Sequence, residues 1–158
     1  MPEKVHRYEV RLRWSGNRGS GTASYGSYGR SHELHVPDKP AILGSADLAF
    51  RGEVDRWNPE ELLVGSLSAC HQLWYLHLCA DAGIVVVAYE DQAEGLMIED
   101  ADGTGRFSQV VLRPCVTIAR GSDSAQALKL HHEANAKCFI ARSMNFPVLH
   151  EPTVSMTE

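Results

Sequence analysis

The chain has 158 residues, 44% of them hydrophobic, which is enough for one compact domain (1–158) that needs no disulfide or structural metal. A formal charge of −5 without a cluster of lysines and arginines argues against a nucleic-acid-binding surface. We find no apolar leader segment and no apolar stretch of about 18 residues, so we predict a soluble, cytoplasmic protein without a membrane partner.

The N-terminal third has the pattern of a β-meander. Apolar and polar residues alternate over Tyr8–Trp14, which predicts a half-buried strand. A glycine-rich turn follows at 15–21, and further strands are predicted at Thr22–Tyr28 and His32–Val36. Residues Pro37–Trp57 contain three more breaking residues and weak periodicity, so they are predicted to form a connecting segment.

The strongest helix signal lies in the middle of the chain. Asn58-Pro59-Glu60-Glu61 combines an asparagine N-cap, a proline at the first helical position and a carboxylate at N3. The helix is predicted to run to about Asp81, and Gly83 is expected to end it in the left-handed conformation. Apolar residues occupy more than one side, which indicates a central helix that needs a surrounding sheet or a partner subunit.

The remaining residues predict a β-hairpin, a second helix and a final strand. The hairpin strands are expected from Ile84 toward Met97 and over Phe107–Ala119. Pro114 cannot donate to a ladder and therefore marks a bulge or an unpaired side. The second helix is expected from Ala125 to about Met144, and Thr153–Met156 can close a sheet.

Two of the four cysteines are candidates for redox chemistry. Cys70 and Cys138 each lie in a predicted helix, and cytosolic disulfides are usually transient and catalytic. Cys79 and Cys115 are predicted to be core residues. No Cys-x-x-Cys motif occurs, and the helical histidines lack the i, i+4 spacing of zinc ligands, so no metal is expected.

Taken together, these features resemble the OsmC/Ohr family, the osmotically inducible and organic hydroperoxide resistance proteins. The resemblance rests on Asn58-Pro59-Glu60-Glu61-Leu62-Leu63, on Ser-Ala-Cys ending at Cys70, and on a cysteine in the second helix. The order of predicted elements also matches, so the resemblance covers nearly the whole chain. It implies an α+β OsmC-like fold, an intertwined homodimer with active sites at the subunit interface, and a thiol peroxidase of the oxidative stress response.

The resemblance implies a role for each of the two cysteines. Cys70 would attack the hydroperoxide as a thiolate and become a sulfenic acid, and Cys138 would condense with it to form a disulfide. An external dithiol, such as dihydrolipoamide or a lipoylated protein, would reduce this disulfide, and no bound cofactor is expected. Phe139 stands where the Ohr branch usually has a proline, which places the chain in an outlying OsmC-like branch.

A thiolate at neutral pH requires a nearby cation. In the family an arginine held by a glutamate supplies it, and the glutamate corresponds to Glu60. Ten helical residues, about 15 Å, separate Glu60 from Cys70, so the partner subunit is expected to present this carboxylate. The resemblance favours Arg51, because its spacing ahead of Asn58 is close to that of the corresponding arginine in the OsmC branch. The alternatives are Arg18, Arg30 and Arg56.

Aromatic residues near the two cysteines are candidates for a substrate pocket. Trp74, Phe139 and Phe146 can line an apolar pocket for an alkyl or lipid hydroperoxide, with ordinary core packing as the alternative. His71 is a further candidate beside Cys70, and either it or His77 can tune the thiol or simply belong to the core.

Two other functional classes remain open at this stage. One is a thiol-based redox sensor or binding protein that uses the same fold without turnover. The other is a hydrolase or transferase with Cys70 as nucleophile and a histidine as base. The sensor would be oxidised without recycling by a dithiol, whereas the hydrolase would form an acyl-enzyme and would not need Cys138.

Overall fold

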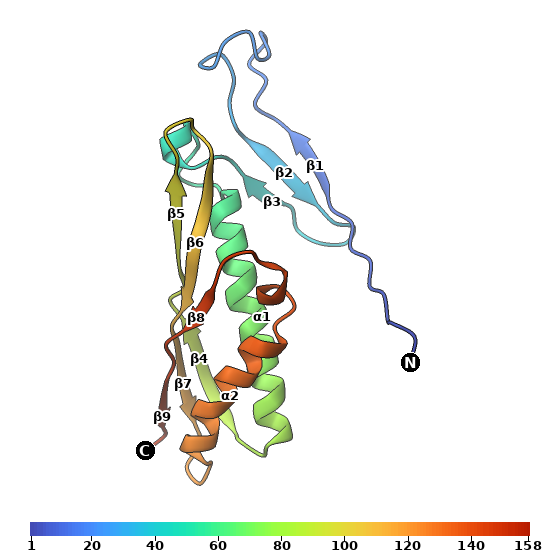
Figure 1. The fold of residues 1–158 in the computed structure, drawn as a ribbon. Coiled ribbons are helices and arrows are strands. Elements are labelled where there is room, and N and C mark those ends of the chain that lie inside the picture. The colour runs from blue at the N-terminus through green and yellow to red at the C-terminus, as the bar shows by residue number, and fades with distance from the viewer. The chain divides into compact units, whose positions relative to one another are not determined.

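The computed structural model describes residues 1–158 and has an α+β fold, which confirms the predicted class (Figure 1). It contains two α-helices, two short 3₁₀ helices and three three-stranded sheets. The chain divides into two compact units, residues 1–62 and 63–158, and helix α1 runs from one into the other. None of the helices combines the length and apolar composition that crossing a membrane requires.

The first unit is built on an antiparallel meander, as predicted. Strands β1 (Arg11–Trp14), β2 (His32–His35) and β3 (Ile42–Gly44) pair in that order, with Leu12 opposite Leu34. The 3₁₀ helix η1 (Leu48–Phe50) follows, with the Asp47 carboxylate accepting from a backbone N–H at its start.

Three predictions for this unit were wrong. Thr22–Tyr28 forms turns instead of a strand, because the Ser27 hydroxyl donates to backbone carbonyls and keeps the segment curled. The first strand begins only at Arg11 and is exposed throughout, because neither hydrophobic core cluster includes any of its side chains. The segment Pro37–Trp57 is more than a connection, since it contains β3 and η1.

Helix α1 (Pro59–Asp81) has the predicted boundaries. The Asn58 side chain accepts from the Glu61 N–H at 2.8 Å, and the Glu61 carboxylate accepts from the Asn58 N–H at 3.2 Å. This reciprocal pair is a capping box. At the other end Gly83 has a φ of +72°, the left-handed conformation expected of it.

One side of α1 faces the core of its own chain. Its buried residues recur every three or four positions, as one helical face requires; they are Leu67, His71, Tyr75, Leu78 and Cys79. Leu73 on another side is 65% exposed. The burial on all sides that the apolar pattern predicted is therefore not achieved within a single chain.

The strands of the second unit form a sheet that is interrupted at one level (Figure 1). Antiparallel pairs join β4 to β7 and β5 to β6, while β8 and β9 run parallel to β6 and β7. The bounds are β4 Val86–Asp91, β5 Glu94–Glu99, β6 Gly105–Leu112, β7 Pro114–Ile118, β8 Val148–His150 and β9 Thr153–Met156. The final strand is confirmed, whereas each predicted hairpin strand is broken in two. Pro114 opens β7, where its missing N–H is tolerated.

The Asp91 carboxylate connects the interrupted strands to helix α1 through hydrogen bonds. One carboxylate oxygen accepts from the backbone N–H of Arg113 at 2.7 Å, and the other accepts from the Ser68 hydroxyl at 2.6 Å. The Arg113 guanidinium lies 3.6 Å from both Glu94 and Glu151, on either side of the break. The carboxylate thus holds two strands and the helix in place two residues before Cys70.

Asp91→Ala is expected to lower the free energy of unfolding by about 2 kcal/mol, since it leaves the Arg113 N–H and the Ser68 hydroxyl without their acceptor. Ser68→Ala should cost about 1 kcal/mol, because one hydrogen bond to the carboxylate is lost. Urea denaturation measures both, with Asp55→Ala in an exposed loop as the matched control. A cost for Asp91→Ala no greater than that of the control would contradict the bridging role.

Helix α2 (Ser124–Lys137) begins as predicted, with the Asp123 carboxylate accepting from the Gln126 N–H at 3.0 Å. Its predicted end near Met144 was wrong. Cys138 has extended backbone angles and ends the helix, and a separate 3₁₀ helix, η2 (Ala141–Ser143), follows. The Cys138 sulfur accepts from the Ala141 N–H at 3.4 Å and the Cys138 carbonyl accepts from the Arg142 N–H at 3.0 Å, and these bonds start a new turn in place of a continued α2.

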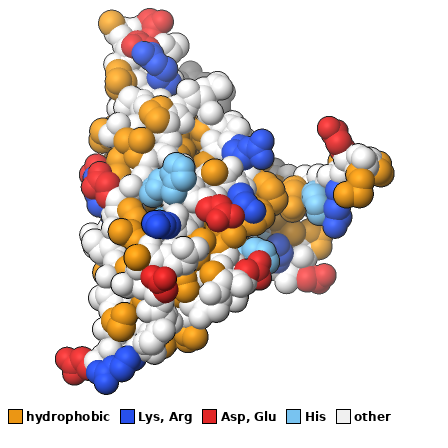
Figure 2. Space-filling model, turned by 60° about the horizontal axis from the view of Figure 1, so that its bottom comes forward, with side chains coloured by type: hydrophobic (Ala, Val, Ile, Leu, Met, Phe, Trp, Pro, Cys, Tyr) orange, Lys and Arg blue, Asp and Glu red, His pale blue; other side chains and the backbone are white.

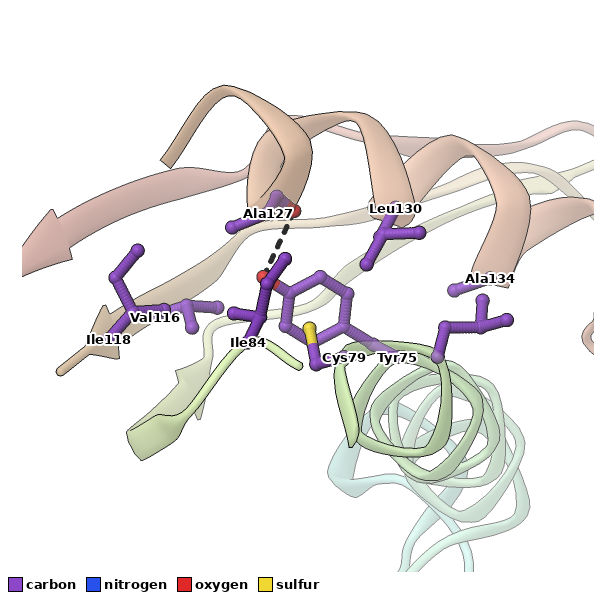
Figure 3. Packing of buried hydrophobic residues seen from close by; sticks show 9 residues of the cluster. Tyr75, Cys79, Ile84, Val116, Ile118, Ala127, Leu130 and Ala134 are labelled. Carbon is purple, nitrogen blue, oxygen red and sulfur yellow. Dashed lines mark hydrogen bonds between the residues drawn. The ribbon is translucent and has the colours of Figure 1, made fainter. Parts of the chain in front are cut away.

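The main core lies between α1, α2 and β7 (Figure 3). Tyr75 projects from α1 toward α2, is fully buried and donates its hydroxyl proton to the Ala127 carbonyl at 3.0 Å. Around it pack Leu78, Cys79, Ile84, Val116, Ile118, Leu130 and Ala134. This cluster fixes α2 against α1 and so positions the cysteine at the end of α2.

Candidate functional site

The fold brings together Cys70 and Cys138, which are 68 residues apart in sequence. Cys70 lies near the middle of α1, Cys138 ends α2, and the Cys70 thiol lies close enough to the Cys138 thiol to raise its pKa. Both are free thiols. Cys70 is partly exposed, whereas Cys138 is 1% exposed. One thiol of the pair is therefore accessible to a dissolved reactant, and the other lies behind it.

The two thiols also differ in their environment. Burial, reinforced by the neighbouring Cys70 thiol and opposed by the Ala141 N–H 3.4 Å from the sulfur, raises the pKa of Cys138 to about 11. Cys138 is therefore protonated at neutral pH. Such a thiol is a poor first nucleophile but can react with an oxidised sulfur placed against it.

Two of the aromatic candidates lie together beside this pair. Trp74, one turn after Cys70, contacts Phe139 edge-on, with ring centroids 5.6 Å apart. Trp74 also lines a shallow hollow of about 180 Å³ with Leu73 and His77. Aromatic surface thus flanks the thiols. Phe146 packs instead against Phe107, in the second core cluster.

His71 lies in a different place from these aromatic residues. It is fully buried, and its Nε2 is 3.1 Å from Nδ1 of His131, which is also fully buried. His131 stacks on Tyr75 with ring centroids 3.8 Å apart, and His150 lies 6.0 Å from His71. His77, by contrast, is exposed and lies 3.4 Å from Asp81.

The two buried histidines are neutral at physiological pH. Burial lowers the pKa of His71 to about 4, and the nearby His150 adds to this effect while Asp91 opposes it. Burial lowers the pKa of His131 to about 3, with further contributions from His71 and His150. Sequence reasoning considered His131 only as a metal ligand. Its position two helical turns before Cys138 was the available signal for a site role.

Glu60 and Arg51 lie in the first unit. One carboxylate oxygen of Glu60 is buried without a hydrogen-bond partner, and no arginine of the chain forms an ion pair with this residue. Arg51 has a left-handed backbone, and its guanidinium lies 5.1 Å from the Tyr25 ring. Arg30, which lies over the same ring at 4.5 Å, lines a hollow of about 370 Å³ with Glu60. The roles assigned to Arg51 and Glu60 remain predictions.

The other two cysteines differ from each other. Cys79 is 1% exposed in the main core, which confirms the prediction for it. Cys115 was predicted to be buried but is exposed. Successive residues of a strand face opposite sides, and in β7 the buried side carries Pro114, Val116 and Ile118.

No three His, Cys, Asp or Glu side chains converge as a metal site would require.

The sequence profile of the family described as OsmC-like protein matches residues 52–152, well over half of the chain. The chain belongs to the OsmC-like protein family. This confirms the resemblance and the OsmC-like fold inferred from the sequence. The match includes Glu60, Cys70 and Cys138, so the whole thiol pair lies within the part of the chain that the OsmC-like family shares.

Individual relatives agree with this assignment to the OsmC-like family. The structure of an OsmC-like protein of unknown function from Vibrio cholerae is 29% identical, with a TM-score of 0.83 over 94% of this chain and all of that one. The uncharacterized protein YmaD of Bacillus subtilis is 24% identical over 88% of this chain and 87% of its own. An organic hydroperoxide resistance protein from Elizabethkingia anophelis shares the fold at 17% identity, with a TM-score of 0.68 over 98% of this chain and all of that one.

Proposed function

We propose that this protein is a thiol peroxidase that reduces organic hydroperoxides to alcohols at the expense of an external dithiol. The observation that carries the proposal is the contact between the partly exposed Cys70 and the buried Cys138. Family membership supports it, because the fold is shared with proteins named for organic hydroperoxide resistance.

The proposed cycle has three steps. The Cys70 thiolate attacks one peroxide oxygen, the O–O bond breaks, and the alcohol leaves with a proton while Cys70 becomes a sulfenic acid. The Cys138 thiol then displaces the hydroxyl group as water, which forms the Cys70–Cys138 disulfide. An external dithiol such as dihydrolipoamide or a lipoylated protein reduces this disulfide and is itself oxidised to a disulfide.

The proposal assigns Arg51 and Glu60 the stabilisation of the Cys70 thiolate. A buried carboxylate oxygen without a partner calls for an explanation, and the oxygen of Glu60 supports a cationic partner from outside the chain. A homodimer would supply it. Figure 2 shows hydrophobic side chains at many points of one face. Over the whole surface, the large apolar side chains exposed in the second unit include Leu73, Val87, Leu96 and Ile98. Such exposed apolar area supports association with a second copy.

Peroxide consumption with dihydrolipoamide as reductant tests the proposal. The unmodified protein should consume cumene hydroperoxide rapidly and hydrogen peroxide more slowly. Cys70→Ser should abolish turnover, with a loss of about a thousandfold or more, because the nucleophile is removed. Cys138→Ser should stop after one oxidation per chain.

Cys115→Ser is the matched control, because this cysteine is exposed and lies on the side of β7 opposite the buried Pro114, Val116 and Ile118. It should leave turnover unchanged. Absence of turnover in the unmodified protein, or full activity of Cys70→Ser, would refute the peroxidase. Oxidation that no dithiol reverses would favour a sensor, and an acyl-enzyme formed without Cys138 would favour a hydrolase.

A further inference from the structure

We propose that the buried His71–His131 pair positions Cys138 against Cys70, and thereby sets how readily the disulfide closes without affecting the attack on peroxide. The inference rests on the proposed function for its place in the catalytic cycle. Both residues are positioning residues, since neither is in contact with the reacting oxygen or sulfur atoms in the proposed steps.

Three polar contacts join α1 to α2, and they follow one another along both helices. The Tyr75 hydroxyl meets the Ala127 carbonyl, His71 meets His131, and the Cys70 thiol meets the Cys138 thiol. The histidine contact is the neighbour of the thiol contact on α1, because His71 directly follows Cys70. On α2, His131 precedes Cys138 by seven residues, two helical turns, and so lies on the same face.

Apart from Lys137 Nζ, which lies 5.6 Å from the Trp74 ring centroid, the remaining contact between these helices is apolar and therefore non-directional. Ala127, Leu130 and Ala134 of α2 contribute small or aliphatic side chains to it. A hydrogen bond between ring nitrogens, by contrast, tolerates only a few tenths of an ångström of displacement. A slide of α2 along α1 that moved Cys138 away from Cys70 would have to break the 3.1 Å contact of His71 with His131.

Stability alone does not account for the pair. His71 Nδ1 and His131 Nε2 are both buried without a hydrogen-bond partner. In either tautomeric arrangement one buried N–H and one buried lone pair remain unpaired, which costs free energy. Two apolar side chains of similar shape would fill the same space at a similar or lower cost. The pair therefore fixes the register of α2 on α1 but adds little net stability.

Cys138 depends on the position of α2 on α1, which the histidine contact fixes together with the contacts that the neighbouring Lys137 and Phe139 make with the Trp74 ring. It ends α2 in an extended conformation, and its sulfur accepts a hydrogen bond from the backbone N–H of Ala141, three residues further along the same segment. That bond moves with Cys138. The register of α2 on α1 consequently determines the distance between the two sulfurs, and with it the effective concentration of one thiol at the other.

The test compares variants of the full-length protein by the equilibrium of its Cys70–Cys138 disulfide with dithiothreitol. His71→Leu combined with His131→Leu removes both partners together and is expected to fold. It should weaken disulfide closure about tenfold, which corresponds to a reduction potential higher by about 30 mV. His71→Gln combined with His131→Asn keeps polar atoms near the Nε2 and Nδ1 positions and should stay within about twofold of the unmodified protein.

Kinetics after one equivalent of cumene hydroperoxide supply the second readout. Sulfenic acid formation should keep its rate in the double-leucine variant, while disulfide closure should slow about tenfold. If the double-leucine variant fails to fold, His131→Gln is compared with His131→Asn. The glutamine amide lies one methylene further from the backbone than the asparagine amide. His131→Gln should therefore shift the disulfide equilibrium, whereas His131→Asn should not.

An unchanged potential in a folded double-leucine variant would overturn the inference, as would equal potentials for His131→Gln and His131→Asn. The dithiothreitol equilibrium requires no reaction with peroxide. A shifted potential in a protein that does not reduce hydroperoxides would therefore support the positioning role and refute the peroxidase. Turnover with unshifted potentials would refute the positioning role alone.

Discussion

Lowering the pH from 7 to 5 is expected to reduce the free energy of unfolding by about 4 kcal/mol, through His71 and His131 together. In the unfolded chain both imidazoles bind a proton as the pH falls through about 6.5. In the folded protein burial lowers the pKa of His71 to about 4 and that of His131 to about 3. Between pH 6.5 and 4 the unfolded state thus holds more protons, so stability falls as the pH falls.

Each histidine contributes about 2 kcal/mol over this range, and the effect is complete once the pH is below both folded-state values. The groups that face the pair are His150, whose pKa burial also lowers, and Asp91, which opposes the shift of His71. His132 in turn faces His150 and lowers its pKa. A loss of this size is a large fraction of the stability of an ordinary domain.

Urea denaturation at a series of pH values measures the effect. The variant with His71→Gln and His131→Asn has no titrating group at this position and should lose most of the dependence between pH 7 and 5. His6→Gln, at an exposed position, should retain it. Equal stability of the unmodified protein at both pH values would contradict the low pKa values of the two buried histidines.

Tyr75→Ala is expected to cost about 3–5 kcal/mol of unfolding free energy, the range for truncating a buried aromatic residue. Tyr75 is fully buried, stacks on His131 and bonds to the Ala127 carbonyl (Figure 3). Truncation would open a cavity between α1, α2 and β7, since all three elements contribute to the cluster around the ring. Tyr75→Phe keeps the ring and should cost about 1 kcal/mol, the net value of one hydrogen bond.

Leu73→Ala is the matched control on the same helix, because this leucine is 65% exposed. Its cost should be below about 1 kcal/mol. Thermal and urea unfolding of the three variants give the comparison. Equal costs for Tyr75→Ala and Leu73→Ala would show that α1 does not present its Tyr75 face to the core of the chain.

Elements with strong local chemistry could be predicted from the sequence. The capping box at Asn58, the left-handed Gly83 and the cap at Asp123 each depend on residues within a few positions of one another. Their physical cause is therefore visible in a short window of sequence. The final strand also follows from local composition and is present at Thr153–Met156.

Features that depend on distant residues could not be predicted in this way. The break after Asp91 requires Arg113 and Ser68, each more than 20 residues away. The contact between His71 and His131 spans 60 residues, and no periodicity encodes it. The pairing of Cys70 with Cys138 was implied by family resemblance and not by a local pattern. Cys115 was assigned to the core because it belongs to no motif, whereas the alternation of β7 places it opposite the buried Val116 and Ile118.

The breaks between β4 and β5, between β6 and β7, and between β8 and β9 lie side by side in the sheet. They affect where the length of the chain can vary. Within a continuous strand, one inserted residue turns every following side chain to the opposite face. Here the segments on either side of Gln92-Ala93 and of Glu151-Pro152 keep their own pairing. An added residue at either point would lengthen the break and leave both alternations intact. Relatives of this protein can therefore gain or lose residues there without rebuilding the hydrophobic face of the sheet.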